Sequence, residues 1–204
     1  NYNPISIHKN LLESLALELD NQLFVEHGGI WHHFDYHSQW SSAHKENLQV
    51  SIQKIQQQVN QYLKKTDVLI ITYGTAWVYQ HKAQNSIVSN CHKVPSGEFE
   101  KRLLTVEEIT DSFRQLFNLV KSLRPDIRII ITVSPVRHIK DTLVLNSVSK
   151  ATLRLACHTL SNQYEEVEYF PSYEIMMDDL RDYRFYDRDK IHPTEEAIDY
   201  ISHK

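Results

Sequence analysis

The sequence predicts an α/β fold in which helices cover both faces of a parallel sheet. Two observations favour this fold. Stretches of helical periodicity alternate with short apolar runs along the chain of 204 residues, and each apolar run ends in a turn. Strands that alternate with helices pair in parallel, and ligands of such folds bind beyond the carboxyl ends of the strands. We therefore expect one domain over residues 1–204, with any site at that edge of the sheet.

Two helices and a strand are expected in the first part of the chain. Pro4 suits the first turn of a helix, and apolar residues at mostly helical spacing continue to about Asp20. Gly28-Gly29 marks a break, and a polar amphipathic helix follows over about residues 45–64. The apolar run within Asp67–Thr72 predicts a strand that is buried on both faces.

The same pattern returns in the second part of the chain. Thr105 and Glu108 have the spacing of a capping box, which predicts the start of a helix that extends to Leu123. The pattern then predicts a buried strand over Ile127–Val133, a helix near residues 146–162, a short strand over Val167–Phe170 and a last helix from about Thr194.

The net charge, the apolar runs and the cysteines limit the kinds of partner and site that we expect. The net charge of −4 gives no electrostatic reason to expect nucleic acid or an anionic membrane as a partner. No apolar run is long enough to span a membrane. Cys91 and Cys157 lack the spacing of a metal or redox motif, so we expect two free thiols.

An acid–base pair lies near the end of the chain. Asp189 precedes His192 by three residues, and Pro193 follows at once. A carboxylate at this spacing can hold one ring nitrogen of the histidine, which leaves the other as a general base. A helix-capping aspartate beside an ordinary histidine would give the same spacing. The pair has two of the three groups of a catalytic triad.

Two further motifs directly follow predicted strands. Gly74 lets the backbone approach a ligand, and the hydroxyl of Thr75 adds a hydrogen-bond donor. Arg137 can bind a carboxylate or phosphate through two N–H groups. Ser134 is a poor candidate nucleophile, because Pro135 removes the N–H that an oxyanion hole would use.

Two polar clusters carry weaker signals. Adjacent residues of an extended chain face opposite ways, so Cys91 and His92 do not form a natural dyad. A segment rich in histidine raises the alternative of a metal-dependent hydrolase, but only His33 and His37 have helical ligand spacing. Its tryptophan, phenylalanine and tyrosine residues favour a lid or substrate-lining loop. We expect no metal and no cofactor.

Several motifs together resemble the GSCFA family, a branch of the SGNH hydrolase superfamily. They cover almost the whole chain: Tyr2-Asn-Pro-Ile-Ser6, Thr72-Tyr-Gly-Thr-Ala-Trp-Val-Tyr79, Asn90-Cys-His-Lys-Val-Pro95, Thr132-Val-Ser-Pro-Val-Arg-His138, Ser149-Lys-Ala151, Tyr169-Phe-Pro-Ser-Tyr-Glu-Ile175 and Asp178–Asp187 with Asp189 and His192.

The resemblance implies a flavodoxin-like, three-layer α/β/α sandwich and a mechanism of the Ser–His–Asp type. Asp189 and His192 match the last sequence block of the superfamily. Gly74 matches the oxyanion-hole block, with Thr75 where many relatives carry Asn. Four further residues match family positions, and we expect them to bind substrate: Asn90, His92, Arg137 and His138.

One departure affects the mechanism. The Gly-Ser-Cys-Phe-Ala motif that names the family, and whose serine is the expected nucleophile, does not occur in residues 1–204. We therefore expect the chain to be incomplete at both ends and the nucleophile to lie upstream. The predicted activity of the intact protein is ester hydrolysis or O-acyl transfer on an acylated carbohydrate. The alternative is a non-catalytic carbohydrate- or ligand-binding module on the same fold.

Overall fold

The computed structural model describes residues 2–204. They form two compact units. Unit 1 contains the described residues up to Asp67 together with Trp77–Leu104 and Asp111–Ile127, and unit 2 contains Val68–Ala76, Thr105–Thr110 and Arg128–Lys204. The prediction of one domain over residues 1–204 remains a prediction.

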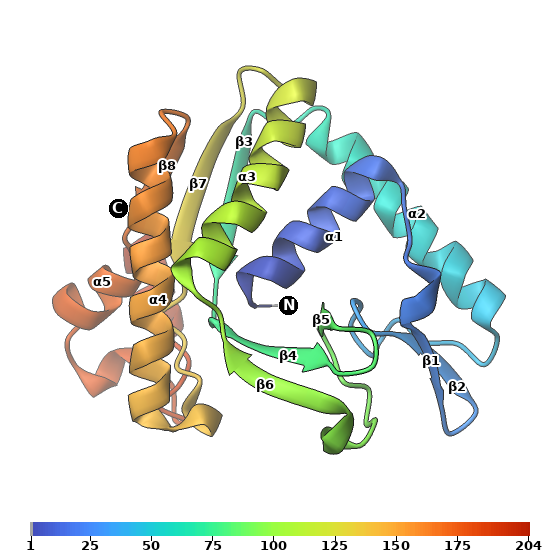
Figure 1. Cartoon of the computed structure of the whole chain (residues 1–204). Helices are drawn as coiled ribbons and strands as arrows, with labels where there is room; N and C mark the ends of the chain where they lie inside the picture. Colours follow the sequence, from blue (N-terminus) through green and yellow to red (C-terminus); the bar gives the residue numbers. More distant parts are fainter. Residues whose placement is uncertain (1) are drawn as a thin grey trace. The chain divides into compact units, whose positions relative to one another are not determined.

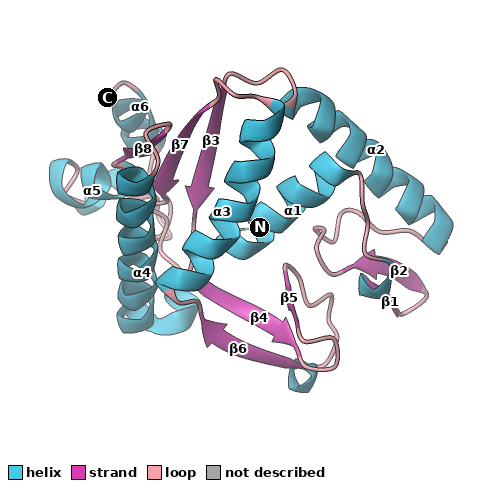
Figure 2. Ribbon diagram, turned by 45° about the horizontal axis from the view of Figure 1, so that its top comes forward, coloured by secondary structure: helices cyan, strands magenta, loops and turns pink. Residues whose placement is uncertain are grey.

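Unit 2 contains the predicted parallel sheet. Its strands are β3 (Val68–Tyr73), β7 (Arg128–Val133) and β8 (Val167–Phe170), in the order β3-β7-β8. Both neighbouring pairs are parallel, with Val68 opposite Arg128 and Ile129 opposite Val167. Figure 2 shows β3 and β7 running side by side. The carboxyl ends of these strands therefore meet at one edge.

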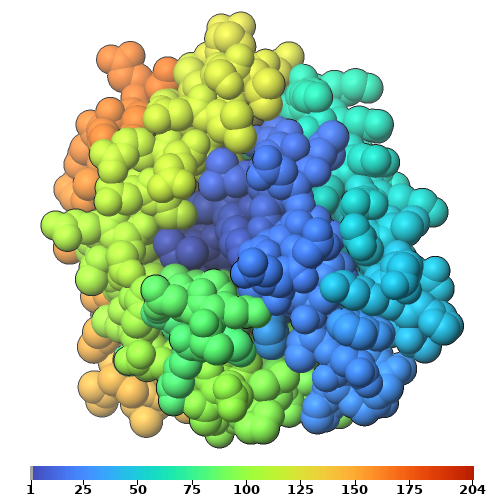
Figure 3. All heavy atoms as spheres, turned by 45° about the vertical axis from the view of Figure 1, so that its right-hand side comes forward, coloured from blue at the N-terminus to red at the C-terminus, as the bar shows by residue number. Residues whose placement is uncertain are grey.

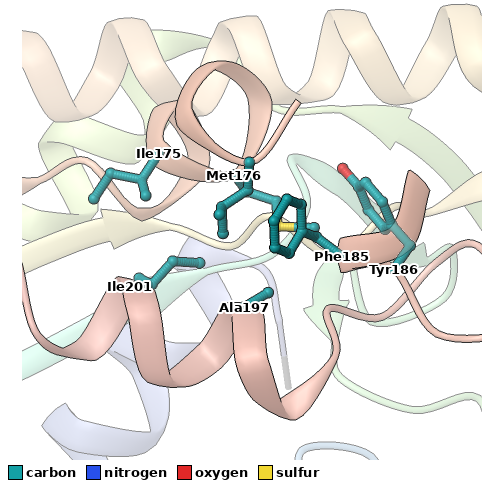
Figure 4. Packing of buried hydrophobic residues seen from close by; sticks show 7 residues of the cluster. Ile175, Met176, Phe185, Tyr186, Ala197 and Ile201 are labelled. Atoms are coloured by element: carbon teal, nitrogen blue, oxygen red, sulfur yellow. The ribbon is translucent and has the colours of Figure 1, made fainter. Parts of the chain in front are cut away.

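Helices flank this sheet, as the α/β/α prediction requires. Helix α4 (Thr142–Gln163) packs against β7 and β8 and lies beside them in Figure 1. Helix α6 (Glu195–Ser202) contributes Ala197 and Ile201 to an apolar cluster with Met176 and Phe185. Figure 4 shows these side chains facing one another. The segment between β8 and α6 forms short turns: α5 (Ser172–Glu174), η4 (Ile175–Asp179) and η5 (Tyr183–Phe185).

Strand β3 is buried on one face only, so the prediction of burial on both faces was wrong. Ile71 and Tyr73 are buried, whereas Val68 and Ile70 are 48% and 64% exposed. Among the described residues β3 is an edge strand that pairs only with β7. Side chains alternate between the faces of a strand, and an apolar run does not reveal that one face is uncovered.

Unit 1 combines helices with two small antiparallel sheets. The hairpin of β1 (Phe24–His27) and β2 (Ile30–His33) turns at Gly28 and Gly29, whose positive φ angles favour glycine. The other sheet has the order β5-β4-β6. Its strands and the helices are β4 (Trp77–His81), β5 (Ser86–Val88), β6 (Phe99–Leu103), α1 (Pro4–Ala16), α2 (Lys45–Leu63) and α3 (Val106–Leu123), the last shared with unit 2.

Helix α1 ends earlier than predicted and buries polar side chains. Leu17 adopts a left-handed backbone with φ 55°, which ends the helix before Asp20. Ser6, His8 and Ser14 are buried, and Figure 3 shows the first residues of α1, in dark blue, recessed below the surface of unit 1. The His8 Nδ1 atom lies 2.9 Å from Ser112 Oγ, and burial lowers the pKa of His8 to about 3.

The predicted capping box at the start of α3 is confirmed. The Thr105 N–H donates to Glu108 Oε2 over 2.8 Å, and the Glu108 N–H donates to Thr105 Oγ1 over 3.1 Å. Within residues 2–204, every helix is too short or too polar to traverse a lipid bilayer.

Candidate active site

Asp189 and His192 form a hydrogen-bonded pair in unit 2. Asp189 Oδ2 lies 2.7 Å from His192 Nδ1, and Asp189 Oδ1 accepts the N–H groups of Ile191 and His192. These hydrogen bonds lower the pKa of the Asp189 carboxyl to about 2, and the bond from the His192 ring has the largest effect. A carboxylate only accepts, so Nδ1 carries the proton and Nε2 presents its lone pair. Both side chains are open to solvent.

A short closed loop positions the pair. Tyr186 and Pro193 form an antiparallel bridge across it, and the Asp187 N–H donates to the His192 carbonyl over 2.8 Å. Tyr186 is buried in the apolar cluster with α6, which anchors one side of the loop (Figure 4). Thr194 caps α6 by accepting the Ala197 N–H, which fixes the other side.

The segment after β7 contacts this loop through Arg137. The Arg137 N–H donates to the Ile191 carbonyl and its guanidinium to the Lys190 carbonyl, each over 3.4 Å. The guanidinium also lies 4.1 Å from the centre of the Tyr186 ring. The structure therefore brings the predicted Arg137 to the loop that contains the predicted Asp189–His192 pair.

A small pocket adjoins this contact. Its volume is about 140 Å³. Arg137 and Tyr186 form part of its wall, and the other residues come from the turns after α5: Met176, Met177, Leu180, Arg181, Asp182 and Tyr183. The pocket offers apolar surface and guanidinium groups close to the loop of the pair.

His138 lies within the electrostatic reach of His192 and of a buried lysine. Burial lowers the pKa of His138, the charge of Lys150 and His192 lowers it further, and Asp141 raises it. The His138 N–H donates to Asn146 Oδ1 over 2.9 Å, which ties the segment after β7 to α4. His138 therefore belongs to the same region as the pair.

The predicted oxyanion residues follow β3 and contact α4. The Thr75 and Ser149 hydroxyl oxygens lie 3.2 Å apart, and the Ala76 N–H donates to Ser149 Oγ over 2.7 Å. The Gly74 carbonyl accepts from Lys150 Nζ over 2.6 Å. The segment is held by Ser149 and Lys150, whose roles were not predicted from the sequence.

The sequence of α4 contains a pattern that could have indicated buried roles for Ser149 and Lys150. The buried stripe of this helix contains Leu153, Ala156 and Cys157 at helical spacing, and Ser149 and Lys150 continue it toward the amino terminus. A serine and a lysine on an apolar stripe indicate buried polar groups that need partners.

The predicted Asn90 and His92 lie in unit 1. Asn90 Nδ2 donates to the Tyr36 carbonyl over 3.0 Å, and His92 Nε2 donates to the His33 carbonyl over 2.8 Å. His92 and Lys93 both have positive φ, a backbone that costs about 1–2 kcal/mol per residue other than glycine. These contacts shape the loop after β5. Substrate binding by Asn90 and His92 stays a prediction.

The histidine-rich segment shows local contacts in unit 1. His33 Nε2 donates to the Asp20 carbonyl, and its Nδ1 accepts the Asp35 N–H. Burial lowers the pKa of His33 to about 4. Within residues 2–204, the structure brings together no group of three or more histidine, cysteine or acidic side chains that could hold a metal ion.

Fold and site together define an α/β protein with an Asp–His pair beside the carboxyl edge of a parallel sheet. The model of the GSCFA family matches residues 1–204, the whole length of the chain. The chain belongs to the GSCFA family. No curated protein matches it.

Proposed function

We propose that the intact protein is an ester hydrolase or an O-acyltransferase that acts on acylated carbohydrate. The observation that carries the proposal is the 2.7 Å bond between Asp189 Oδ2 and His192 Nδ1. It leaves Nε2 as a general base with a carboxylate behind it, the arrangement used to activate a hydroxyl nucleophile. Family membership and the Ser–His–Asp mechanism that the resemblance implies support the same reaction class.

In the proposed mechanism a serine attacks the acyl carbonyl. This serine is that of the Gly-Ser-Cys-Phe-Ala motif of the family, which does not occur in residues 1–204. His192 Nε2 takes the serine proton and returns it to the departing sugar oxygen, while Asp189 stabilises the imidazolium. Water or the hydroxyl of a second sugar then releases the acyl group from the serine.

Stabilisation of the oxyanion falls to the segment after β3. Gly74 and Thr75 lie at the carboxyl end of that strand, where backbone N–H and hydroxyl donors can face a ligand. Because Ser149 already accepts the Ala76 N–H, we assign the oxyanion donors to Gly74 and Thr75 and leave Ala76 out.

Replacement of His192 tests the proposal. In a chain extended upstream to the family serine, we expect His192→Ala to lower hydrolysis of p-nitrophenyl acetate by about 10³-fold or more. The matched control is His203→Ala, since His203 is an exposed histidine of the same unit. Activity of His192→Ala equal to that of the control would refute the assignment.

The alternative is a carbohydrate- or ligand-binding module without turnover. It is favoured by the contact between Thr75 Oγ1 and Ser149 Oγ, because this contact competes with donation to an oxyanion. Binding of a glycan by the extended protein, without covalent labelling by a fluorophosphonate probe, would select this alternative. Labelling that disappears in a serine-to-alanine variant would exclude it.

A further inference from the structure

A buried lysine joins the ends of two strands in unit 2. Lys150 is 2% exposed, and its Nζ donates to the carbonyls of Gly74 and Ser134 over 2.6 Å each. Gly74 follows β3 and Ser134 follows β7, so one ammonium group spans the two neighbouring strand ends. Hydrogen bonds from a charged donor are about twice as strong as neutral ones.

The two carbonyls belong to the segments that carry the proposed chemistry. The segment after β3 contains Gly74 and Thr75, the proposed oxyanion donors. The segment after β7 contains Arg137, which contacts the loop of Asp189 and His192. A shift of either strand end would move one half of the site relative to the other.

We infer that Lys150 is a positioning residue that sets the oxyanion segment against the Asp189–His192 loop. This inference rests on the proposed function. Ser149 supports the same segment through the Ala76 N–H, so two successive residues of α4 hold it from one side. Lys150 acts through the backbone and does not contact the reacting atoms.

The charge on Lys150 is sensitive to pH. Burial lowers the pKa of its ammonium to about 7, so the charge is present below that pH and is lost above it. The titratable side chain that interacts electrostatically with Lys150 is His138, whose own pKa is also influenced by Asp141 and His192. The neutral amine is a weaker donor, and we expect its two bonds to loosen as the pH rises through 7.

A titration of the unaltered chain tests the geometry without any assay of activity. We expect the ¹³C shifts of the Gly74 and Ser134 carbonyls to follow the ¹⁵N shift of Lys150 Nζ, with one shared midpoint. A His138→Gln background removes the contribution of the neighbouring ring. Carbonyl shifts that do not follow Lys150 would overturn the inference, and this result is available even if variants of Lys150 fail to fold.

Kinetics of the extended protein test the consequence for catalysis. We expect Lys150→Met to lower kcat by about 100-fold with KM changed less than about threefold, because orientation is lost in the transition state and not in binding. Lys140→Met, an exposed lysine in the turn Ile139–Asp141, is the matched control. A folded Lys150→Met variant with the kcat of this control would contradict the inference.

The two proposals fail in different ways. If His192→Ala keeps full activity, the proposed function falls while the carbonyl titration still decides the role of Lys150 in positioning the strand ends. If His192→Ala is inactive and the titration shows no link between Lys150 and the two carbonyls, the proposed function stands and the positioning role falls.

Discussion

At the residue scale, the Asp189–His192 pair is organised although it is exposed. Asp189 accepts three hydrogen bonds within four residues of sequence, two of them from backbone N–H groups. Local backbone geometry therefore fixes the carboxylate, and burial is not needed. This explains how a spacing of three residues alone could predict the contact.

The pKa of Asp189 gives a first prediction. We expect His192→Ala to raise it from about 2 toward 3.8, the ordinary value of an aspartate, because the bond from the His192 ring is the largest cause of the depression. A carboxyl-detected NMR titration measures this change. The bond stabilises the fold fully above pH 3.8, and this contribution is lost as the pH falls through 2. An unchanged midpoint would mean that the backbone bonds suffice.

Replacement of Asp189 gives a second prediction. In the extended protein, we expect Asp189→Asn to lower kcat by about 10³- to 10⁴-fold, because an amide facing Nδ1 favours the wrong tautomer of His192. Asp187→Asn, an exposed acid in the same loop, is the control. Steady-state kinetics at pH 7 measure both, and equal values for the two variants would contradict the assigned role.

At the scale of single elements, the capping box of α3 was predicted correctly from the sequence, whereas the burial of β3 was not. The box of Thr105 and Glu108 depends on residues three positions apart, so the sequence contains all of its information. Burial of β3 depends on which segments cover it, and the sequence of the strand contains none of that information. The antiparallel sheet of β4, β5 and β6 was missed because its strands are short and mix polar with apolar residues.

The capping box gives a third prediction. We expect Thr105→Ala to lower the free energy of unfolding by about 1 kcal/mol, because two N–H groups at the start of α3 depend on this residue and its partner. Thr105→Ser keeps the hydroxyl and serves as the control. Chemical denaturation measures both, and equal losses would show that the bond is not the cause.

Two isoleucines on neighbouring strands give a fourth prediction. Ile131 of β7 is fully buried, and Ile70 of β3 is 64% exposed. We expect Ile131→Ala to cost about 2–5 kcal/mol, since it leaves a cavity, and Ile70→Ala to cost less than about 1 kcal/mol. Denaturation compares the two directly. A large loss for Ile70→Ala would show that its face is covered in solution.

At the scale of the whole molecule, buried histidines set the response to acid. The pKa of His8 falls to about 3 and that of His33 to about 4, both mainly through burial. In the unfolded chain each of these histidines binds a proton below about pH 6.5. Both histidines therefore reduce the stability of the fold as the pH falls from about 6.5 toward their folded pKa values. Glu13 acts in the opposite direction, because burial raises its pKa to about 7 and the folded state then holds the proton.

The acid response gives a fifth prediction. Between pH 6 and 4.5, we expect His8→Phe to reduce the fall of unfolding free energy by about 1–2 kcal/mol, since each proton contributes up to about 1.4 kcal/mol per pH unit. Phenylalanine suits the edge contact that His8 makes with Phe113. His37→Phe, at an exposed site, is the control. Equal slopes in wild type and His8→Phe would contradict the assignment.

The α/β class, the parallel sheet, the capping box and the Asp189–His192 pair could all be predicted from the amino-acid sequence. Each depends on periodicity or on residues at most a few positions apart, and the family model over residues 1–204 agrees with the family resemblance. Only the tertiary structure showed that one face of β3 is open, that Arg137 contacts the loop of the pair, and that Lys150 bridges Gly74 and Ser134. These features depend on residues that are far apart in the chain and that only the packing of the folded chain brings together or leaves uncovered.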